Sequence, residues 1–294
     1  MTLEQLRIFV AVAEREHVTR AAADLHLTQS ATSAAIAALE NRYDAKLFDR
    51  VGRRIELTEA GRLFLVEARA VLARAAAAET LLTDLAGLKR GALSLAASQT
   101  VANYWLPPLM HQFRERHPGI ALSLRIGNTE QVAHWIHETS ADIGLIEGEI
   151  DDPALAMRQV AEDEMVLVVG RGHPWAGRTA VTPAELPGTG WVLREPGSGT
   201  RSMFETWLRE EGVSPDSLSS VMELPSNEAV RSAVAAGAGA TAISRLVVET
   251  LLSAGTLVAI GLSLPKRRFT ALRHKERHVT QAERAFFALI AEQP

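Results

Sequence analysis

The chain has 294 residues, of which 47% are hydrophobic and 22% are charged, a balance typical of folded globular domains rather than disordered chains. It contains no cysteine, which excludes disulfide bonds, thiolate metal sites and thiol-based redox sensing. The formal net charge of −4 argues against a broadly basic coat for nucleic acid but allows a local basic patch. No apolar run is long enough for a membrane span, and the N-terminus lacks a signal-peptide pattern, so we expect a cytoplasmic location.

The first 43 residues predict three helices. Apolar residues at helical spacing predict the first. Thr19 is suited to cap a short second helix, and Thr28 to cap a third that continues to Tyr43. Two short helices joined by a tight turn, with small residues on one face of the third helix, predict a helix-turn-helix motif over about residues 18–37.

A local excess of basic residues follows the third helix, where a short hairpin with Gly52 at its turn is expected to form a wing. Wing arginines would contact phosphates while the helix reads bases. The alternative is a small three-helix domain with a solvated basic loop. The residues expected to contact DNA are Thr19, Arg20, Thr28, Gln29, Ser30, Thr32, Ser33, Arg50, Arg53 and Arg54.

Residues 59–90 predict a long helix and hinge, with Thr58 as the helix cap. Apolar residues in the helix alternate four and three positions apart, a heptad seam that requires a partner helix. The alternative is a helix packed on the core of its own chain. The seam residues expected to support dimerisation are Phe64, Val71, Leu82 and Leu85.

From residue 91 to 294 short apolar strands alternate with helices, which predicts an α/β domain with mostly parallel sheets. In such sheets ligands bind beyond the carboxyl ends of the strands, where helices begin. These junctions carry hydroxyl, amide and glycine residues that predict a site for a small polar ligand, with Arg201 as its fixed cation. Taken singly, each residue could instead be an ordinary helix cap. The expected site residues are Ser98, Gln99, Thr100, Asn128, Thr129, Glu147, Gly148, Ser198, Gly199, Thr200, Arg201 and Asn227.

The stretch REPGSGTR, residues 194–201, lies between an apolar run and a predicted helix. Glycines let backbone N–H groups approach a ligand, and a helix N-terminus attracts negative charge. The spacing is not that of a Walker motif, so a nucleoside triphosphate is not expected. The alternative is a tight strand-to-helix turn.

Enzyme signatures are missing from the sequence, which has no nucleophile elbow, zinc-binding HExxH or dinucleotide fingerprint. His134 and His137 lie three residues apart on a predicted helix, but no third metal ligand is evident. Ser198 has no His and Asp partners by spacing. We therefore expect neither catalysis nor a metal or cofactor, and the alternative function is a small-molecule-binding protein or enzyme with an oligomerisation arm that does not bind DNA.

The first 60 residues resemble the winged helix-turn-helix of LysR-type transcriptional regulators. The matching motifs are AA at 21–22, LTQS at 27–30, SxxIxxLE at 33–40, LFDR at 47–50 and LTEAG at 57–61. Two alanines, Ala34 and Ala35, stand where many members of the family carry basic or long polar residues, and Thr32 replaces an aliphatic residue. Base reading is therefore expected to depend on Gln29, Ser30, Ser33 and the wing.

The remaining chain looks like the LysR-type effector domain, which resembles periplasmic solute-binding proteins with two subdomains beside a cleft. The resemblance implies subdomain I at about residues 91–161 and 265–294 and subdomain II at about 162–264. The expected fold is thus an N-terminal all-α winged helix-turn-helix over residues 1–58, a long linker helix, and an α/β two-subdomain effector domain.

The effector domain is most similar to the branch of regulators of sulfur assimilation and carbon fixation, whose members sense small anions or phosphorylated metabolites. Ser98 and Thr100 match hydroxyl positions that bind sulfate in the sulfur-assimilation regulators, but Val101 replaces a glutamine of those proteins. The match to the sulfate-binding proteins is therefore incomplete, and we expect a small anionic metabolite, either a sulfur oxyanion or a small carboxylate. Glu147 is unfavourable to a dianion, and we expect it to pair with an arginine or with a proton of the ligand.

The resemblance also implies the partners of the chain. They are double-stranded promoter DNA, a small-molecule effector, and further copies of the chain in a homodimer, commonly assembled as a dimer of dimers. Binding of the effector is expected to change the bend or spacing of the bound DNA.

Overall fold

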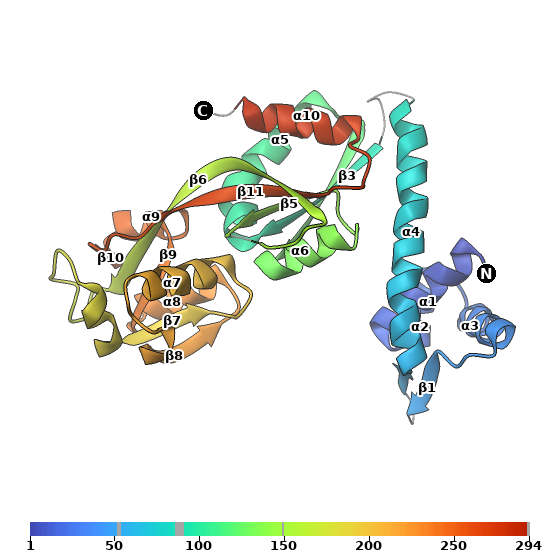
Figure 1. Ribbon diagram of the computed structural model, residues 1–294, viewed down its shortest axis with the longest axis horizontal. Helices are drawn as coiled ribbons and strands as arrows, with labels where there is room; N and C mark the ends of the chain where they lie inside the picture. The colour runs from blue at the N-terminus through green and yellow to red at the C-terminus, as the bar shows by residue number, and fades with distance from the viewer. Residues whose placement is uncertain (52–53, 86–90, 149, 293–294) are drawn as a thin grey trace. The chain divides into compact units, whose positions relative to one another are not determined.

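The computed structural model describes residues 1–51, 54–85, 91–148 and 150–292. They belong to two compact units, Met1–Leu82 and Thr83–Pro294, called here the N-terminal and C-terminal units (Figure 1). None of the helices in these ranges is long and apolar enough to cross a membrane.

The N-terminal unit contains three helices, a hairpin and the start of a long helix, as the sequence predicted. The elements are α1 Leu3–Arg15, α2 Val18–Asp24, α3 Gln29–Tyr43, β1 Phe48–Val51, β2 Arg54–Leu57 and α4 Glu59–Leu85. In the core, the ring of Phe9 on α1 lies 5.4 Å from that of Phe48 on β1 and 4.9 Å from that of Phe64 on α4. The hairpin and α4 therefore pack together on α1.

Two of the three predicted helix caps are confirmed. The Thr28 hydroxyl accepts a hydrogen bond from the backbone N–H of Ala31, and that of Thr58 accepts one from Gly61. The cap at Thr19 is wrong, because α2 already begins at Val18 and the imidazole of His17 accepts from the backbone N–H of Arg20. A cap residue must lie before the first helical turn, and Thr19 lies within it.

Glu40 joins α3 to the wing. Its buried carboxylate accepts hydrogen bonds from the backbone N–H groups of Leu47 and Phe48, at 2.8 and 3.2 Å. At the start of α4, a Cβ on Gly61 would lie 2.1 Å from the backbone oxygen of Leu47. Only glycine permits this approach, so α4 and the wing are held in close contact.

The C-terminal unit is built on a nine-stranded sheet in the order β4-β3-β5-β11-β6-β9-β7-β8, with β10 paired to β6. Neighbours at the two ends of the sheet are parallel, as predicted, but β6 and β11 run antiparallel to their neighbours and cross between the halves (Figure 1). The strands are β3 Gly91–Ser98, β4 Ile120–Gly127, β5 Ile143–Glu147, β6 Leu155–Gly170, β7 Gly190–Arg194, β8 Ser219–Leu224, β9 Ala240–Ser244, β10 Leu257–Ile260 and β11 Lys266–His274.

Helices cover both halves of the sheet. Four elements were not predicted from the sequence, namely α9, α10, β10 and β11. A π-helical turn, η1 Val101–Trp105, follows β3, and short 3₁₀ turns occupy η2 Pro183–Gly188 and η3 Pro215–Ser217. The α-helices are α5 Leu106–Arg116, α6 Thr129–His137, α7 Gly199–Glu210, α8 Asn227–Ala235, α9 Arg245–Ser253 and α10 Gln281–Ala291.

Each half of the sheet has its own hydrophobic core. In subdomain I, Phe113, Phe269 and Phe286 join α5, β11 and α10. In subdomain II, Trp191 and Phe204 join β7 and α7. Separate cores joined by two crossing strands leave the strand ends of both halves facing a shared cleft, which is the predicted two-subdomain fold.

Candidate functional site

Residues from the strand ends of both subdomains meet around the guanidinium of Arg267 on β11. Arg267 donates to the hydroxyl of Thr200 at 2.9 Å and to that of Thr100 at 3.2 Å. Asn227 donates to the same Thr100 hydroxyl at 3.0 Å. The end of β3 and the starts of α7 and α8 are therefore joined by one polar network. We call it the strand-end cluster: Ser98, Thr100, Glu147, Thr200, Asn227 and Arg267.

Arg267 is completely buried, with 0% of its surface exposed. Its Nε lies 2.5 Å from a carboxylate oxygen of Asp163 on β6, and one Nη lies 3.9 Å from Glu147. Asp163 also accepts a hydrogen bond from Ser244 at 3.1 Å. Because a buried charge requires both a counter-ion and hydrogen bonds, this pair holds the two crossing strands in one arrangement.

The carboxylate of Glu147 accepts hydrogen bonds from the two hydroxyls that were predicted to bind a ligand, those of Ser98 and Thr100. Ser98 donates to one oxygen, and Thr100 donates to the other at 3.3 Å. Thr129 donates to the backbone oxygen of Glu147 at 2.8 Å. The Thr100 hydroxyl donates one hydrogen bond, to Glu147, and accepts two, from Arg267 and Asn227. Its hydrogen-bonding capacity is therefore fully used. An anion entering the cluster must therefore compete with a carboxylate of the chain itself.

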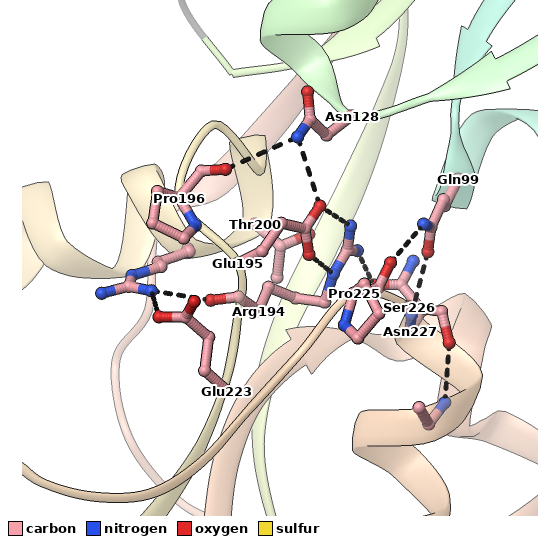
Figure 2. Close-up of polar contacts among 12 residues, drawn as sticks. Gln99, Asn128, Arg194, Glu195, Pro196, Thr200, Glu223, Pro225, Ser226 and Asn227 are labelled. Carbon is pink, nitrogen blue, oxygen red and sulfur yellow. Dashed lines mark hydrogen bonds and ion pairs between the residues drawn. The ribbon is translucent and has the colours of Figure 1, made fainter. Parts of the chain in front are cut away.

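Arg194, at the end of β7, is a second buried cation of the site. Its Nε and one Nη donate to the two oxygens of Glu195, and its other Nη donates to Asn227 at 2.5 Å (Figure 2). Although burial alone would raise the pKa of Glu195, the Arg194 guanidinium holds this pKa below its ordinary value. Asn128 also donates to Glu195 at 3.3 Å, which links subdomain I to this pair.

Arg201, predicted to be the fixed cation of the ligand site, is paired with two carboxylates of the chain. Its guanidinium lies 2.7 Å from Glu205, one turn later on α7, and 2.5 Å from Glu223 on β8. Burial opposes the shift, but these two carboxylates raise the pKa of Arg201 above its ordinary value. Its charge is thus already neutralised. The buried cations of the site are Arg267, within the strand-end cluster, and Arg194, which donates to Asn227 of that cluster. Neither was predicted from the sequence.

The loops that carry Gly148 and Gly199 touch through their backbones. A Cβ on Gly199 would lie 2.1 Å from the backbone oxygen of Glu147, and Gly148 has a φ of +96°. Next to this contact, the buried hydroxyl of Ser198 has no hydrogen-bond partner among the described residues. Ser198 therefore offers a hydrogen-bonding group that the protein itself does not use.

Gln99, which follows β3 in subdomain I, bridges to the start of α8 in subdomain II. Its side-chain nitrogen donates to the backbone oxygen of Pro225 at 2.8 Å, and its oxygen accepts from the backbone N–H of Asn227 at 2.9 Å (Figure 2). A pocket of about 300 Å³ opens beside the cluster, bounded by Thr129, Gly199 and Arg201 among others. Four of the predicted site residues line this pocket, namely Thr129, Gly148, Gly199 and Arg201. Five others are buried in the polar network, namely Ser98, Thr100, Glu147, Thr200 and Asn227.

In the N-terminal unit, the predicted DNA-contacting residues divide into exposed and buried ones. Gln29 and Ser30 are exposed on α3, and Ser33 is half-buried. Thr32 is 0% exposed and donates to the backbone oxygen of Thr28, so its predicted contact with DNA is wrong. Thr19 and Arg20 are exposed on α2. Arg53 lies outside the described residues, as do the side chains of Arg50 and Arg54.

The predicted dimerisation seam begins on a buried face of α4. Phe64 is half-buried and packs against Phe9 in its own unit, so it contacts the core of that unit rather than standing free on the helix. The large apolar side chains exposed on the described part of α4 are Leu63, Val66 and Val71, at 69%, 57% and 41%. The side chains of Leu82 and Leu85 lie outside the described residues.

The two histidines considered as a metal site have separate partners. His134 lies 3.3 Å from Glu138, and His137 lies 2.8 Å from Asp152. In the part of the chain that the structure describes, no group of three His, Cys, Asp or Glu residues could hold a metal ion.

Comparison with known proteins gives two family matches that together cover nearly the whole chain. Residues 3–62 match the bacterial regulatory helix-turn-helix protein, lysR family, and residues 86–294 match the LysR substrate binding domain. The uncharacterized HTH-type transcriptional regulator YeiE of Escherichia coli (strain K12) is 35% identical over 97% of this chain and 96% of its own. The RuBisCO operon transcriptional regulator of Allochromatium vinosum is 35% identical over 91% of this chain and 88% of its own.

Among solved structures, the regulatory domain of CcmR from Synechocystis PCC6803, in complex with 2-PG, aligns with a TM-score of 0.63 and 26% identity. The alignment covers 69% of this chain and 97% of the CcmR domain. These relatives are transcriptional regulators rather than enzymes, and they include the carbon-fixation branch to which the sequence pointed.

Proposed function

The chain belongs to the LysR family of bacterial DNA-binding transcriptional regulators, and we propose that the cleft of its C-terminal unit senses a small oxyanion- or carboxylate-bearing metabolite. The observation that carries this proposal is the strand-end cluster, where hydroxyls from both subdomains surround buried Arg267. The complex of the similar CcmR regulatory domain with 2-PG supports a ligand-binding role for this unit.

The backbone of the cleft favours an anion. Helices α6, α7 and α8 all begin at this edge of the sheet, at Thr129, Gly199 and Asn227. The N-terminus of a helix carries unpaired N–H groups and a partial positive charge, so it attracts oxyanions. We propose that the ligand contacts Ser198 and takes the hydroxyls of Ser98 and Thr100 from Glu147.

Ser198 provides the sharpest test, because its hydroxyl has no partner to lose among the described residues. We would follow thermal unfolding of the full chain with sulfate, sulfite, thiosulfate, phosphate and small carboxylates. An anion at about one hundred times its dissociation constant should stabilise the chain by about 2.7 kcal/mol. Ser198→Ala should unfold at the parent temperature without ligand and bind the active anion roughly five- to tenfold more weakly.

The matched control is Ser232→Ala, which removes an exposed hydroxyl on α8. It should leave binding of the anion unchanged. If none of the anions shifts the unfolding temperature, or if Ser198→Ala binds the active anion as the parent does, the proposed ligand class or its position is wrong.

For DNA binding by the N-terminal unit, we propose that α3 enters the major groove of promoter DNA and places Gln29, Ser30 and Ser33 there. The wing arginines contact phosphates. Arg50→Ala should then weaken binding to all sequences and reduce the slope of log affinity against log salt by about 0.9. Gln29→Ala should instead reduce the preference for the operator over unrelated DNA. Unchanged affinity, selectivity and salt slope in both variants would contradict this interface.

We further propose that residues 1–58 bind DNA, that residues 59–90 form a linker, and that residues 91–294 bind the effector. In this proposal the linker dimerises through the heptad seam of α4, which contains Val71, Leu82 and Leu85. Val71→Glu, which places a charge on the exposed part of this seam, should shift the chain from dimer to monomer in light scattering. Phe64→Ala should instead destabilise the N-terminal unit, because the Phe64 ring packs against Phe9 of its core. We propose that dimers pair into a dimer of dimers, whose footprint on DNA changes length or bend when the effector binds.

A further inference from the structure

One short turn of subdomain I places neighbouring aromatic rings in the cores of both subdomains. It is the π-helical turn η1, which follows β3. The ring of Trp105 lies edge-on to that of Phe269 in subdomain I, with 5.8 Å between the ring centres. The ring of Tyr104 packs instead against buried residues of subdomain II that include Val230 and Val234 of α8. π-Helical turns are rare and occur frequently at functional sites, and this one links the two subdomains.

A carboxylate of α8 completes this link between the subdomains. Oε1 of Glu228 accepts a hydrogen bond from the hydroxyl of Tyr104 at 3.1 Å and another from the side-chain nitrogen of Asn103 at 3.2 Å. Burial, followed by the charge and the hydrogen bond of Glu228, raises the pKa of Tyr104 above its ordinary value, although the charge of Arg231 partly offsets this. The phenol therefore stays protonated at neutral pH and donates to Glu228.

The two segments that carry this contact also carry part of the strand-end cluster. Thr100 directly precedes η1, and Asn227 directly precedes Glu228. The side chain of Asn227 donates to the hydroxyl of Thr100 at 3.0 Å. A ligand that takes over the Thr100 hydroxyl therefore acts on the same turn that holds Tyr104 in subdomain II.

We propose that Tyr104 and Glu228 form a latch that keeps the two subdomains closed around the cleft in the absence of a ligand. Both residues position the subdomains and do not contact the ligand. Opening must withdraw the Tyr104 ring from apolar contacts and leave the Glu228 carboxylate without its two donors, and both changes cost free energy. The closed arrangement brings the hydroxyls of Thr100 and Thr200 together, so the latch also strengthens the binding of a ligand that contacts both subdomains. This last consequence rests on the proposed function.

The test is hydrogen exchange of the full chain without ligand, measured by mass spectrometry resolved to single residues. The backbone N–H of Glu130 donates to the backbone oxygen of Gly197 across the cleft at 3.3 Å. It lies on α6, which carries no part of the latch, so a merely local role of the latch would not change its exchange. In Glu228→Ala and in Tyr104→Phe, this N–H should exchange about five- to tenfold faster than in the parent.

A second N–H of α6 serves as the internal reference. The backbone N–H of Val132 donates to the backbone oxygen of Asn128 within the same helix at 3.0 Å. It should exchange at the parent rate in both variants, because opening of the cleft leaves α6 intact.

Two further variants separate the latch from general effects of charge and of substitution. The double variant of Tyr104→Phe and Glu228→Ala should exchange at Glu130 within about twofold of Glu228→Ala alone, because the two side chains share one contact. The matched control, Glu249→Ala, removes an exposed carboxylate of α9 in the same subdomain and should leave this exchange unchanged.

Three results would overturn the proposal. They are parent exchange of the Glu130 N–H in both single variants, equal acceleration of the Val132 N–H, and effects that multiply fully in the double variant. Because the measurement uses no ligand, failure of the latch is distinct from failure of the proposed function.

Discussion

Replacing the buried carboxyl of Glu283 by an amide should stabilise the protein at alkaline pH and have little effect at acidic pH. Glu283 lies on α10 with 2% of its surface exposed, and its Oε1 has no hydrogen-bond partner among the described residues. Burial, reinforced by the neighbouring carboxylate of Asp142, raises the pKa of Glu283 from 4.5 to about 7, although Arg277 partly offsets this. The folded protein therefore prefers the protonated form.

The sign and size of the change in unfolding free energy follow from this pKa shift. Because the pKa is higher in the folded than in the unfolded chain, the folded state holds an extra proton between pH 4.5 and about 7. The free energy of unfolding thus falls as the pH rises through this window and stays low above it. A shift of this size corresponds to roughly 3 kcal/mol, so Glu283→Gln should gain up to about 3 kcal/mol at pH 8 and less than about 1 kcal/mol at pH 5.

Urea unfolding followed by tryptophan fluorescence measures this quantity, because all five tryptophans lie in the C-terminal unit, which contains Glu283. The control is Glu115→Gln, an exposed carboxyl on α5 of the same subdomain, which should change the unfolding free energy little at either pH. An equal gain for Glu283→Gln at pH 5 and pH 8, or a loss at pH 8, would refute burial of an unpaired carboxyl as the cause.

Further substitutions test contacts within each of the two units. Asp163→Asn should lower the unfolding free energy of the C-terminal unit by about 3–5 kcal/mol in the same urea assay, because it removes the charge of the nearest counter-ion of buried Arg267. Glu40→Ala should destabilise the N-terminal unit by about 1–3 kcal/mol, measured by circular dichroism, since two backbone N–H groups lose their acceptor. Thr28→Ala should lower the free energy of unfolding of the N-terminal unit by about 1 kcal/mol in the same measurement, because it removes a helix cap. Thr19→Ala removes no cap and should leave this free energy nearly unchanged.

The fold of the N-terminal unit could be predicted because its signals are local. Thr28 and Thr58 each cap a helix that begins at the next residue, so the pattern and its consequence lie within four positions. The error at Thr19 came from His17, whose imidazole accepts the same hydrogen bond that a hydroxyl would accept. Local composition alone does not separate two possible caps two residues apart.

The antiparallel strands β6 and β11 were harder to predict because their pairing is non-local. The run KRRFTALRH, residues 266–274, looks like a basic surface segment. Every second residue from Arg267 to Ala271 is nevertheless buried on one face of β11, and such alternation is typical of a strand. This pattern could have predicted the strand. The carboxylate that makes a buried arginine possible, Asp163, lies 104 residues earlier in the chain.

The positions of the candidate site were therefore predictable, but its charges were not. Hydroxyls at strand ends follow from a rule about parallel sheets, and they converge as expected. The sequence did contain a warning against Arg201, because Glu205 lies four residues later on the same helix, a spacing that favours an ion pair.

The charges of the cleft set a condition on any anionic effector. The guanidinium groups of Arg194 and Arg267 face three carboxylates, those of Glu147, Asp163 and Glu195. An anion that only adds its charge to this group would be repelled, since charges in a buried site are weakly screened. The proposed ligand must therefore displace one carboxylate from its donors. Glu147 is the one whose release leaves both arginines paired, because Arg267 keeps Asp163 and Arg194 keeps Glu195. Exchange at Glu147 would thus free the hydroxyls of the cleft without leaving a buried arginine unpaired.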